Sequence, residues 1–253
     1  MRTLHETNLI FRRAMRLSLR NPIWVILGLI QPILYLTMFG PLLENMTRVQ
    51  GWPTGDPWQV FVPGLLVQLG IFGAAFVGFG LVAEMRAGVV ERMRVTPASR
   101  LALLLGRVLR DVVVLLVQGV ILVACAELFG LDAPLAGLVL GLLVVAALGA
   151  AFSSASYAAA LMLKSEDALA PLANGLAVPL LLLSGILLPM SLAPGWLEAI
   201  SDANPVKHVV DGVRALFLEG SVTMTVVWGV VATLGLVAAG LALGTRTFER
   251  ESG

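Results

Sequence analysis

The sequence predicts an all-α membrane protein with six transmembrane helices and with both chain ends in the cytoplasm. Of its 253 residues, 58% are hydrophobic and only 13% are charged, about half the charged share of an ordinary soluble domain. The apolar residues fall in runs near the ~20 residues that a helix needs to cross the hydrocarbon. Because these runs are apolar on all faces, they do not fit barrel strands, which alternate in character.

The six runs define the predicted spans. They comprise residues 23–43, 59–83, 111–131, 135–163, 168–192 and 225–245. The first run is longer than the ~7–15 apolar residues of a signal peptide, so we expect it to remain as a span.

Lys and Arg residues predict the orientation, because they concentrate in cytoplasmic connections. With both ends inside, 14 of the 17 basic residues lie on the cytoplasmic side. These are Arg2, Arg12, Arg13, Arg16, Arg20, Arg86, Arg92, Arg94, Arg100, Arg107, Arg110, Lys164, Arg246 and Arg250. Only Arg48, Lys207 and Arg214 lie outside. Of the 17 basic residues, all but Lys164 and Lys207 are Arg, a bias that is typical of GC-rich bacterial genomes. We therefore expect a protein of a bacterial plasma membrane.

An amphipathic helix is expected before the first span, within residues 1–22. On a helical wheel, Arg12, Arg13, Arg16 and Arg20 share one arc and apolar side chains fill the other. That pattern is typical of a helix lying along the membrane surface, and Asn21-Pro22 would turn the chain inward. A generic membrane anchor and a docking role fit this segment equally well.

Residues 84–110 form the second notable cytoplasmic segment. Thr96 before Pro97 reads as an N-cap followed by proline at the first helical position. We therefore expect a short helix over residues 85–93, then a new helix running through 101–110 into the third span. This two-helix elbow would expose Val89, Val90 and Met93 among charged side chains, a surface that suits a protein partner.

The connection between spans five and six, residues 193–224, is too apolar for a free loop and too broken for a span. Two short helices dipping back into the outer leaflet fit it, with Trp196 at the interface. Pro179, Pro189, Pro194 and Pro205 would supply the breaks. Residues 246–253 then form a cytoplasmic tail.

Motifs for catalysis are absent from the sequence. No Gly-x-x-x-x-Gly-Lys-Ser/Thr phosphate-binding loop occurs, so the chain is not expected to hydrolyse ATP or to bind a cofactor itself. The two histidines, His5 and His208, fall on opposite sides of the membrane and cannot share a metal site. A net charge of +1 gives no sign of nucleic-acid binding.

Ionisable residues in the spans would indicate ion coupling. Glu127 is the strongest candidate, although a carboxylate at headgroup level explains it better than a proton relay. Asp111 follows Arg110 at the inner boundary and is expected to form an ordinary ion pair with it.

Uncharged side chains give candidates for a substrate pathway. They are Gln31, Gln68, Phe72, Phe76, Phe79, Ser153, Ser156 and Asn174. For the amides, hydrogen bonds between helices explain the residues at least as well as substrate contact, and for the phenylalanine stripe helix packing is favoured over the wall of a pathway. The pairs Gly137/Gly141 and Gly240/Gly244 have the spacing of close helix packing.

Three stretches together resemble the membrane subunits of ABC-2 type transporters, close to daunorubicin-resistance drug exporter permeases. The first is residues 11–32, a basic helix and Asn-Pro followed by a span with Gln-Pro. The second is residues 84–110, with Thr-Pro-x-Ser-Arg and Leu-Leu-Leu-Gly-Arg. The third is residues 183–218, with Leu-Ser-Gly-x-x-x-Pro, Pro-x-Trp-Leu and Asn-Pro. The resemblance covers nearly the whole chain, as one transmembrane domain over residues 1–253.

The resemblance implies the partners and the mechanism. Such a permease pairs with a second copy or a paralogue and with two cytoplasmic ATPase subunits, which hold ATP and Mg. The elbow would insert into a groove on the ATPase, braced by the amphipathic helix, and a hydrophobic drug, lipid or natural product would move outward. The broken segment around residues 185–217 would gate the outer face. The contact residues would be Glu84, Arg86, Val89, Val90, Glu91, Arg92, Met93 and Arg94.

Three other functions remain open on the sequence. The first is a permease for a polysaccharide or lipid-linked polymer, which would need a wider channel lined by polar and aromatic residues. The small number of polar residues in the predicted spans disfavours this function. The second is an ion-coupled carrier acting alone, which would need several buried charged residues, and the predicted spans do not supply them. The third is a non-transporting scaffold in a membrane complex, which loss of efflux in a point mutant would exclude.

Overall fold

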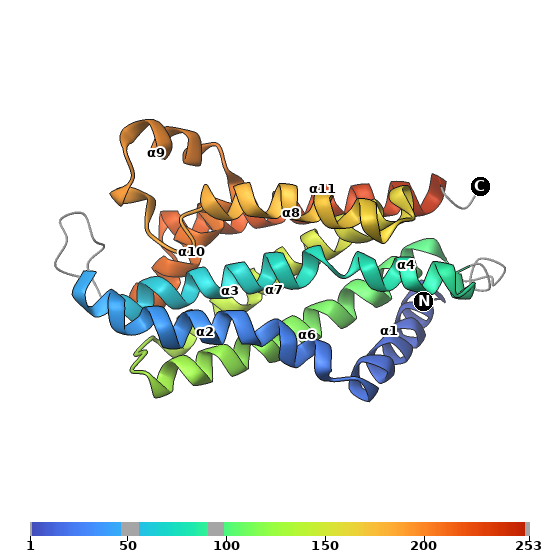
Figure 1. Ribbon diagram of the computed structural model, residues 1–253, viewed down its shortest axis with the longest axis horizontal. Helices are drawn as coiled ribbons and strands as arrows, with labels where there is room; N and C mark the ends of the chain where they lie inside the picture. Colours follow the sequence, from blue (N-terminus) through green and yellow to red (C-terminus); the bar gives the residue numbers. More distant parts are fainter. Residues whose placement is uncertain (1, 47–55, 91–98, 251–253) are drawn as a thin grey trace.

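Helices make up nearly all of the chain that the computed structural model describes, namely residues 2–46, 56–90 and 99–250. No strand occurs among these residues, so the predicted all-α class is confirmed. In chain order the elements are α1 (Arg2–Arg20), α2 (Ile23–Met46), α3 (Pro57–Ala75), α4 (Gly78–Arg86), α6 (Arg100–Leu128), α7 (Leu135–Leu163), α8 (Glu166–Leu182), the 3-10 turn η1 (Met190–Leu192), α9 (Gly195–Asp202), α10 (Pro205–Glu219) and α11 (Met224–Arg250). The long helices form a lengthwise bundle (Figure 1). We call its two ends the α1 end, which also holds the end of α11, and the α9 end.

Four segments are long and apolar enough to cross a membrane, judged by length and composition. They are Pro57–Arg86, Arg100–Leu128, Leu135–Leu163 and Met224–Phe248. The helices α1 and α2 together make a fifth candidate, bent by 68° between them, and the predicted turn at Asn21-Pro22 lies at this bend. The described chain is therefore that of a multi-pass membrane protein, whereas the count of six spans stays a prediction.

The predicted second span is interrupted. Helix α3 ends at Ala75 and α4 begins at Gly78. At this break the Ser156 hydroxyl of α7 donates to the Ala75 carbonyl oxygen at 2.6 Å and accepts from the Gly78 amide at 3.0 Å. A Cβ on Gly78 would lie 2.6 Å from the Ser156 carbonyl oxygen. One serine thus satisfies two backbone groups that a broken helix would otherwise leave unpaired.

The elbow differs from its prediction at both ends. Helix α4 ends at Arg86, and Gly88 takes a left-handed φ of 66° before helical backbone resumes at Val89. The predicted start of the short helix near residue 85 is therefore wrong. Helix α6 begins at Arg100, with Ser99 as N-cap accepting from the Ala102 amide at 3.2 Å. The predicted start at Thr96-Pro97 falls outside the described residues, but α6 does run unbroken into the third span, as expected.

The predicted fifth span, residues 168–192, is shorter in the structure. Helix α8 has 17 residues and ends at Leu182. The chain then turns at Gly185, whose φ of 70° is a conformation open to glycine without steric penalty. Pro179 lies inside α8, so the break predicted there is wrong.

Two short helices, α9 and α10, follow this turn, and their presence was predicted. Pro189 precedes η1, Pro194 precedes α9 and Pro205 opens α10, so these three prolines do mark boundaries. Trp196 of α9 is exposed. Re-entry of the pair into a membrane stays a prediction.

Glycines allow the closest helix contacts, as their spacing predicted. A Cβ on Gly137 of α7 would lie 2.0 Å from the Leu216 carbonyl oxygen of α10. A Cβ on Gly240 of α11 would lie 2.4 Å from the Ala151 carbonyl oxygen of α7. These contacts leave no room for any larger residue and hold α7, α10 and α11 together as one packed unit.

Candidate functional site

The α1 end carries the described part of the predicted contact surface. Glu84 binds Arg107 of α6, and Arg86 lies 3.3 Å from Glu166 of α8. Val89 is half-buried, but Val90 is only 7% exposed and belongs to an apolar cluster with Leu81, Val82 and other side chains. The expected exposure of Val90 is therefore wrong, because its side chain closes the local core. The predicted contact residues Glu91, Arg92, Met93 and Arg94 lie outside the described residues.

Helix α1 is fixed against the start of α6. The Glu6 carboxylate accepts a hydrogen bond from the Ser99 amide at 2.8 Å, which is one of the free N–H groups at the start of a helix. About two turns further along α6, a Cβ on Gly106 would lie 2.7 Å from Ile10 and 2.9 Å from the Thr7 carbonyl oxygen. The connection between residues 90 and 99 is therefore anchored at both ends, by Val90 in the core and by Ser99 on α1.

A group of ionisable side chains joins four helices at the same end. Asp111 of α6 lies 3.1 Å from Arg110, confirming the expected ion pair, and accepts a 2.6 Å hydrogen bond from the Tyr157 hydroxyl of α7. Arg110 also donates to Tyr157 and to Ser18 of α1, both at 3.4 Å. Arg107 adds α4 to the group through Glu84. Arg107, Asp111 and Tyr157 are all buried.

This cluster is larger than the sequence suggested. The spacing of Arg107, Arg110 and Asp111 by three and four residues places them on one face of a helix, which was the available signal. Nothing in the sequence pairs Asp111 with Tyr157, 46 residues away. Glu127, the other ionisable candidate, is exposed at the α9 end.

The predicted pathway residues occupy different environments. Gln68 is buried, and its Oε1 atom has no hydrogen-bond partner among the described residues. Ser153 is buried too, and its hydroxyl donates to the Ala150 carbonyl oxygen of its own helix. Gln31 and Asn174 are exposed on α2 and α8, where each binds a group four residues earlier or later in its own helix.

The three phenylalanines of the stripe are partly buried and lie in contact with one another. Ring centroids are 6.2 Å apart between Phe72 and Phe76 and 5.8 Å apart between Phe76 and Phe79. The stripe crosses the break between α3 and α4, where the Ser156 hydroxyl holds the backbone. A pathway through these eight residues stays a prediction.

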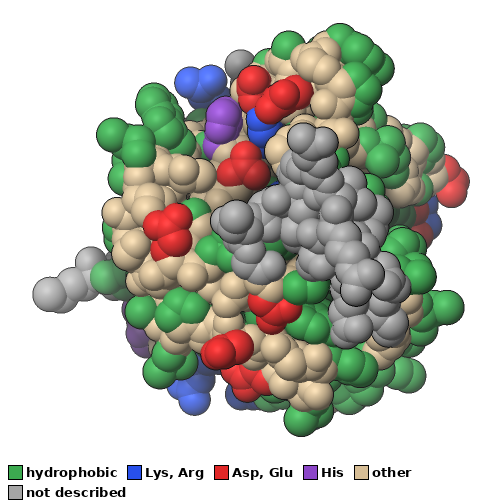
Figure 2. Space-filling view, turned by 90° about the vertical axis from the view of Figure 1, so that its left-hand side faces the viewer, with side chains coloured by type: hydrophobic (Ala, Val, Ile, Leu, Met, Phe, Trp, Pro, Cys, Tyr) green, Lys and Arg blue, Asp and Glu red, His purple; other side chains and the backbone are tan. Residues whose placement is uncertain are grey.

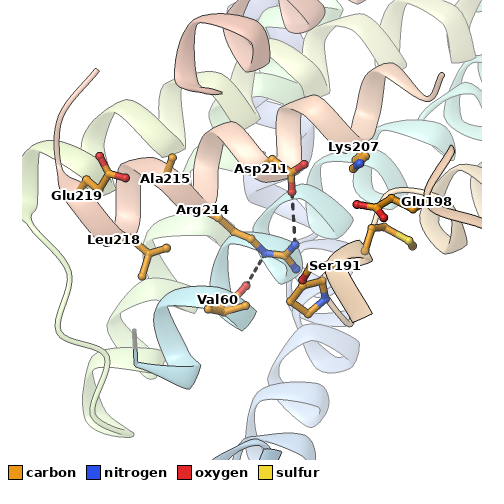
Figure 3. A pocket seen from close by; sticks show the side chains of 11 residues that line it. Val60, Ser191, Glu198, Lys207, Asp211, Arg214, Ala215, Leu218 and Glu219 are labelled. Atoms are coloured by element: carbon orange, nitrogen blue, oxygen red, sulfur yellow. Dashed lines mark hydrogen bonds and ion pairs between the residues drawn. The ribbon is translucent and has the colours of Figure 1, made fainter. Parts of the chain in front are cut away.

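The α9 end holds a cavity of about 290 Å³ that the sequence did not reveal (Figure 3). Its wall comprises Val60, Pro189, Met190, Ser191, Glu198, Lys207, Asp211, Arg214, Ala215, Leu218 and Glu219. Lys207 binds Asp202, and this hydrogen bond lowers the pKa of the Asp202 carboxyl below its ordinary value. Acidic side chains are scattered over this end of the molecule (Figure 2).

Arg214 of α10 joins three segments beside this cavity. Its Nε donates to the Val60 carbonyl oxygen of α3 at 2.9 Å, and one terminal nitrogen donates to the carbonyl oxygens of Gly185 at 2.6 Å and Ile186 at 3.3 Å. The other terminal nitrogen lies 3.8 Å from Asp211 (Figure 3). The Arg214 side chain is only 7% exposed, so a buried cation is satisfied mainly by backbone oxygens.

A metal centre finds little support at either end. Within residues 2–46, 56–90 and 99–250, no three His, Cys, Asp or Glu side chains group closely enough to hold a metal ion. What the two ends offer chemically is ion pairing and hydrogen bonding between segments.

The chain is similar to known transport proteins. A family model described as ABC-2 type transporter matches residues 5–218. A daunorubicin resistance ABC transporter permease of Streptomyces coeruleorubidus is 27% identical over 242 residues, covering 95% of this chain and 84% of the relative. A probable doxorubicin resistance ABC transporter permease of Mycobacterium tuberculosis is 25% identical over 250 residues, covering 96% and 88%. A putative transport permease of Cyanophora paradoxa is 27% identical over 204 residues, covering 80% and 70%.

Proposed function

The chain belongs to the ABC-2 type transporter family, and we propose that it is the permease subunit of an ATP-driven exporter. It moves a hydrophobic drug, lipid or natural product outward across a bacterial plasma membrane. A separate cytoplasmic ATPase, in two copies, supplies the energy and holds ATP and Mg. A second copy of this chain or a paralogue completes the membrane part.

The observation that carries this proposal is the anchored connection at the α1 end. Residues 90 and 99 are held by the apolar cluster and by Glu6, and α6 continues from there as one helix of 29 residues. A displacement of Val90 or Ser99 therefore moves the helices to which these residues are fixed. Such a device suits a subunit that receives its energy from a neighbouring protein.

The distribution of charge supports an orientation with the α1 end in the cytoplasm. Exposed basic side chains crowd α1, whereas acidic ones prevail at the α9 end (Figure 2). Lys and Arg favour the cytoplasmic side of a membrane. Both ends of the described chain lie at the α1 end (Figure 1), which requires an even number of crossings.

The proposed class of cargo is inferred from the names of the similar proteins. Two of them are named for resistance to daunorubicin or doxorubicin, so a hydrophobic drug-like compound is the first cargo to test. Membrane lipid is the second, since both would reach the protein from the bilayer.

The test is reconstitution of the chain in vesicles with and without a candidate ABC ATPase subunit. We expect ATP-dependent efflux of daunorubicin only when both proteins are present. Gly106→Leu should keep membrane insertion and ATPase binding yet lose at least tenfold of the efflux per ATP hydrolysed, because it displaces α1 from α6. Gly80→Leu is the matched control, since a Cβ there meets nothing within 4 Å.

Two results would overturn the proposal. One is movement of cargo by the chain alone along an ion gradient, which would make it a carrier. The other is stable binding of the ATPase without any ATP-dependent movement of cargo, which would make the chain a scaffold.

A further inference from the structure

The α9 end contains an internal contact between a turn and a helix. The turn at residues 183–186 rests on the first part of α3, where a Cβ on Gly64 would lie 2.1 Å from the Ile186 carbonyl oxygen. We call this contact of Gly185 and Ile186 with Val60 and Gly64 the seal. The Arg214 guanidinium bridges it by donating to carbonyl oxygens on both sides.

Arg214 projects from a helix that is firmly fixed. A Cβ on Gly137 of α7 would lie 2.0 Å from the Leu216 carbonyl oxygen of α10. On another side, a Cβ on Gly212 of α10 would lie 3.1 Å from the Gly229 Cα of α11. With α7 and α11 this close, α10 cannot shift without disturbing the packed unit that they form.

The chain on the other side of the seal is loosely held. Of the 17 residues of α8, only Leu169 and Ala177 are buried. None is buried in η1, and only Ser201 is buried in α9. The turn is the exception, because Ser184 and Ile186 are both fully enclosed. Helix α8 packs against α7 and is paired with α4 through Glu166 and Arg86, whereas the segment from η1 to α9 stands apart from the bundle in Figure 1. This projecting segment is thus attached through the turn at its start and through α10 at its end.

The cavity next to Arg214 makes release of the turn physically reasonable. It offers about 290 Å³ of free space between η1, α9 and α10. Asp211 stands 3.8 Å from the guanidinium and does not belong to the turn. If the turn leaves, Arg214 keeps a counter-ion, so opening does not strand a buried charge without a partner.

From this geometry we propose that Arg214 is the positioning residue that holds the outer seal shut, and that the seal opens when cargo leaves. This inference rests on the proposed export function and deepens it. Closing depends on a few hydrogen bonds from a rigid helix to an enclosed turn whose neighbouring segments, α8 and α9, bury few side chains. Such a contact can break and re-form as a unit, whereas an interdigitated apolar contact could not do so as readily.

The experiment measures how fast a thiol in the turn is labelled from outside. Cys125, the only cysteine, is replaced by serine, and Ser184→Cys is the reporter. Ser154→Cys reports on a serine of α7 that is equally buried, at 0% exposure like Ser184, and that is not among the predicted pathway residues. A membrane-impermeant maleimide is applied to whole cells and to the purified complex with its ATPase.

Two independent changes should open the seal. Arg214→Lys keeps the charge but cannot bridge three carbonyl oxygens, and Gly64→Ala forces the turn off α3 without touching Arg214. Each should raise labelling at position 184 by about tenfold or more without nucleotide, the change expected from losing one charge-assisted hydrogen bond. Gly73→Ala, also in α3, should leave the rate unchanged because a Cβ there meets nothing within 4 Å.

The outcomes separate the seal from general loosening and from the export function. Unchanged labelling at position 184 in both variants overturns the seal, and so does an equal rise at position 154, which a merely structural role would give. If the Arg214→Lys protein does not accumulate in cells, the labelling rate of the Gly64→Ala variant alone tests the seal. In the parent protein, ATP turnover should accelerate labelling at 184. A rate indifferent to ATP, with both variants still fast, would support the seal and count against the export cycle.

Discussion

The two ends of the molecule are held together in different ways. At the α1 end, side chain meets side chain across long helices: Glu84 with Arg107, and Asp111 with Arg110 and Tyr157. At the α9 end, two side chains bind backbone carbonyl oxygens: Arg214 binds those of Val60 and Gly185, and Asn204 binds that of Leu180 at 3.1 Å. The first arrangement joins helices into one body, whereas the second attaches the turn at residues 183–186 through a few hydrogen bonds.

This contrast fits a transporter that an ATPase displaces at one end and that opens at the other end. A rigid body transmits a displacement along its length. A weakly packed segment belongs to the low-stability part of a fold and opens locally. Three measurements of stability test the contrast.

The largest effect is expected from Asp111→Ala. The change leaves the partly buried Arg110 guanidinium and the buried Tyr157 hydroxyl without the carboxylate that they share. Removing one member of a fully buried ion pair costs about 3–5 kcal/mol. Because Arg110 is partly exposed, we expect a loss near the lower end of this range, measured as a large fall in the melting temperature in detergent.

Asp167→Ala serves as the control for that change. Asp167 is exposed in the first turn of α8, and its loss should leave the melting temperature nearly unchanged. Equal melting of the two variants would mean that the cluster does not hold the α1 end together.

A smaller loss is expected from Ser156→Ala, which removes the hydroxyl that bridges α3 and α4. The Ala75 carbonyl oxygen and the Gly78 amide would both lose their partner at a buried site. The expected destabilisation is about 1–3 kcal/mol, read from denaturant-induced unfolding.

Ser154→Ala is the matched comparison on the same helix. The Ser154 hydroxyl donates only to the Ala150 carbonyl oxygen within α7, so its removal should cost well under half as much. If both serines cost the same, the break between α3 and α4 does not depend on Ser156.

The smallest global effect is expected at the α9 end, from Asn204→Ser. Serine keeps a side-chain oxygen that can accept from the Val206 amide, as the Asn204 side chain does at 3.0 Å, but it loses the donation to Leu180. Overall stability should fall by about 1 kcal/mol or less, while hydrogen exchange in the amides of α9 should become faster.

Asn204→Ala removes both contacts and provides the calibration. It should add the loss of an N-cap, about 0.5–2 kcal/mol, and should speed exchange in the first turn of α10 as well. If Asn204→Ala lowered the overall stability as much as Asp111→Ala does, the two ends would not differ in how they are held together.

The sequence by itself determined the helical class, most of the helix positions and the close glycine contacts. These follow from hydrophobic runs and from residue spacing within single helices, which are local properties of the chain. It likewise predicted the bend at Asn21-Pro22 and the pairing of Arg110 with its neighbour Asp111.

Only the tertiary structure decided which polar groups meet. Tyr157 reaches Asp111 across 46 positions, Ser156 reaches Ala75 across 81, and Arg214 reaches Val60 across 154. In an apolar environment each buried polar group must find a partner wherever the packed helices bring one near. That choice depends on the mutual placement of helices, which no local pattern encodes, and so the break in the second span, the burial of Val90 and the seal all emerged from the fold.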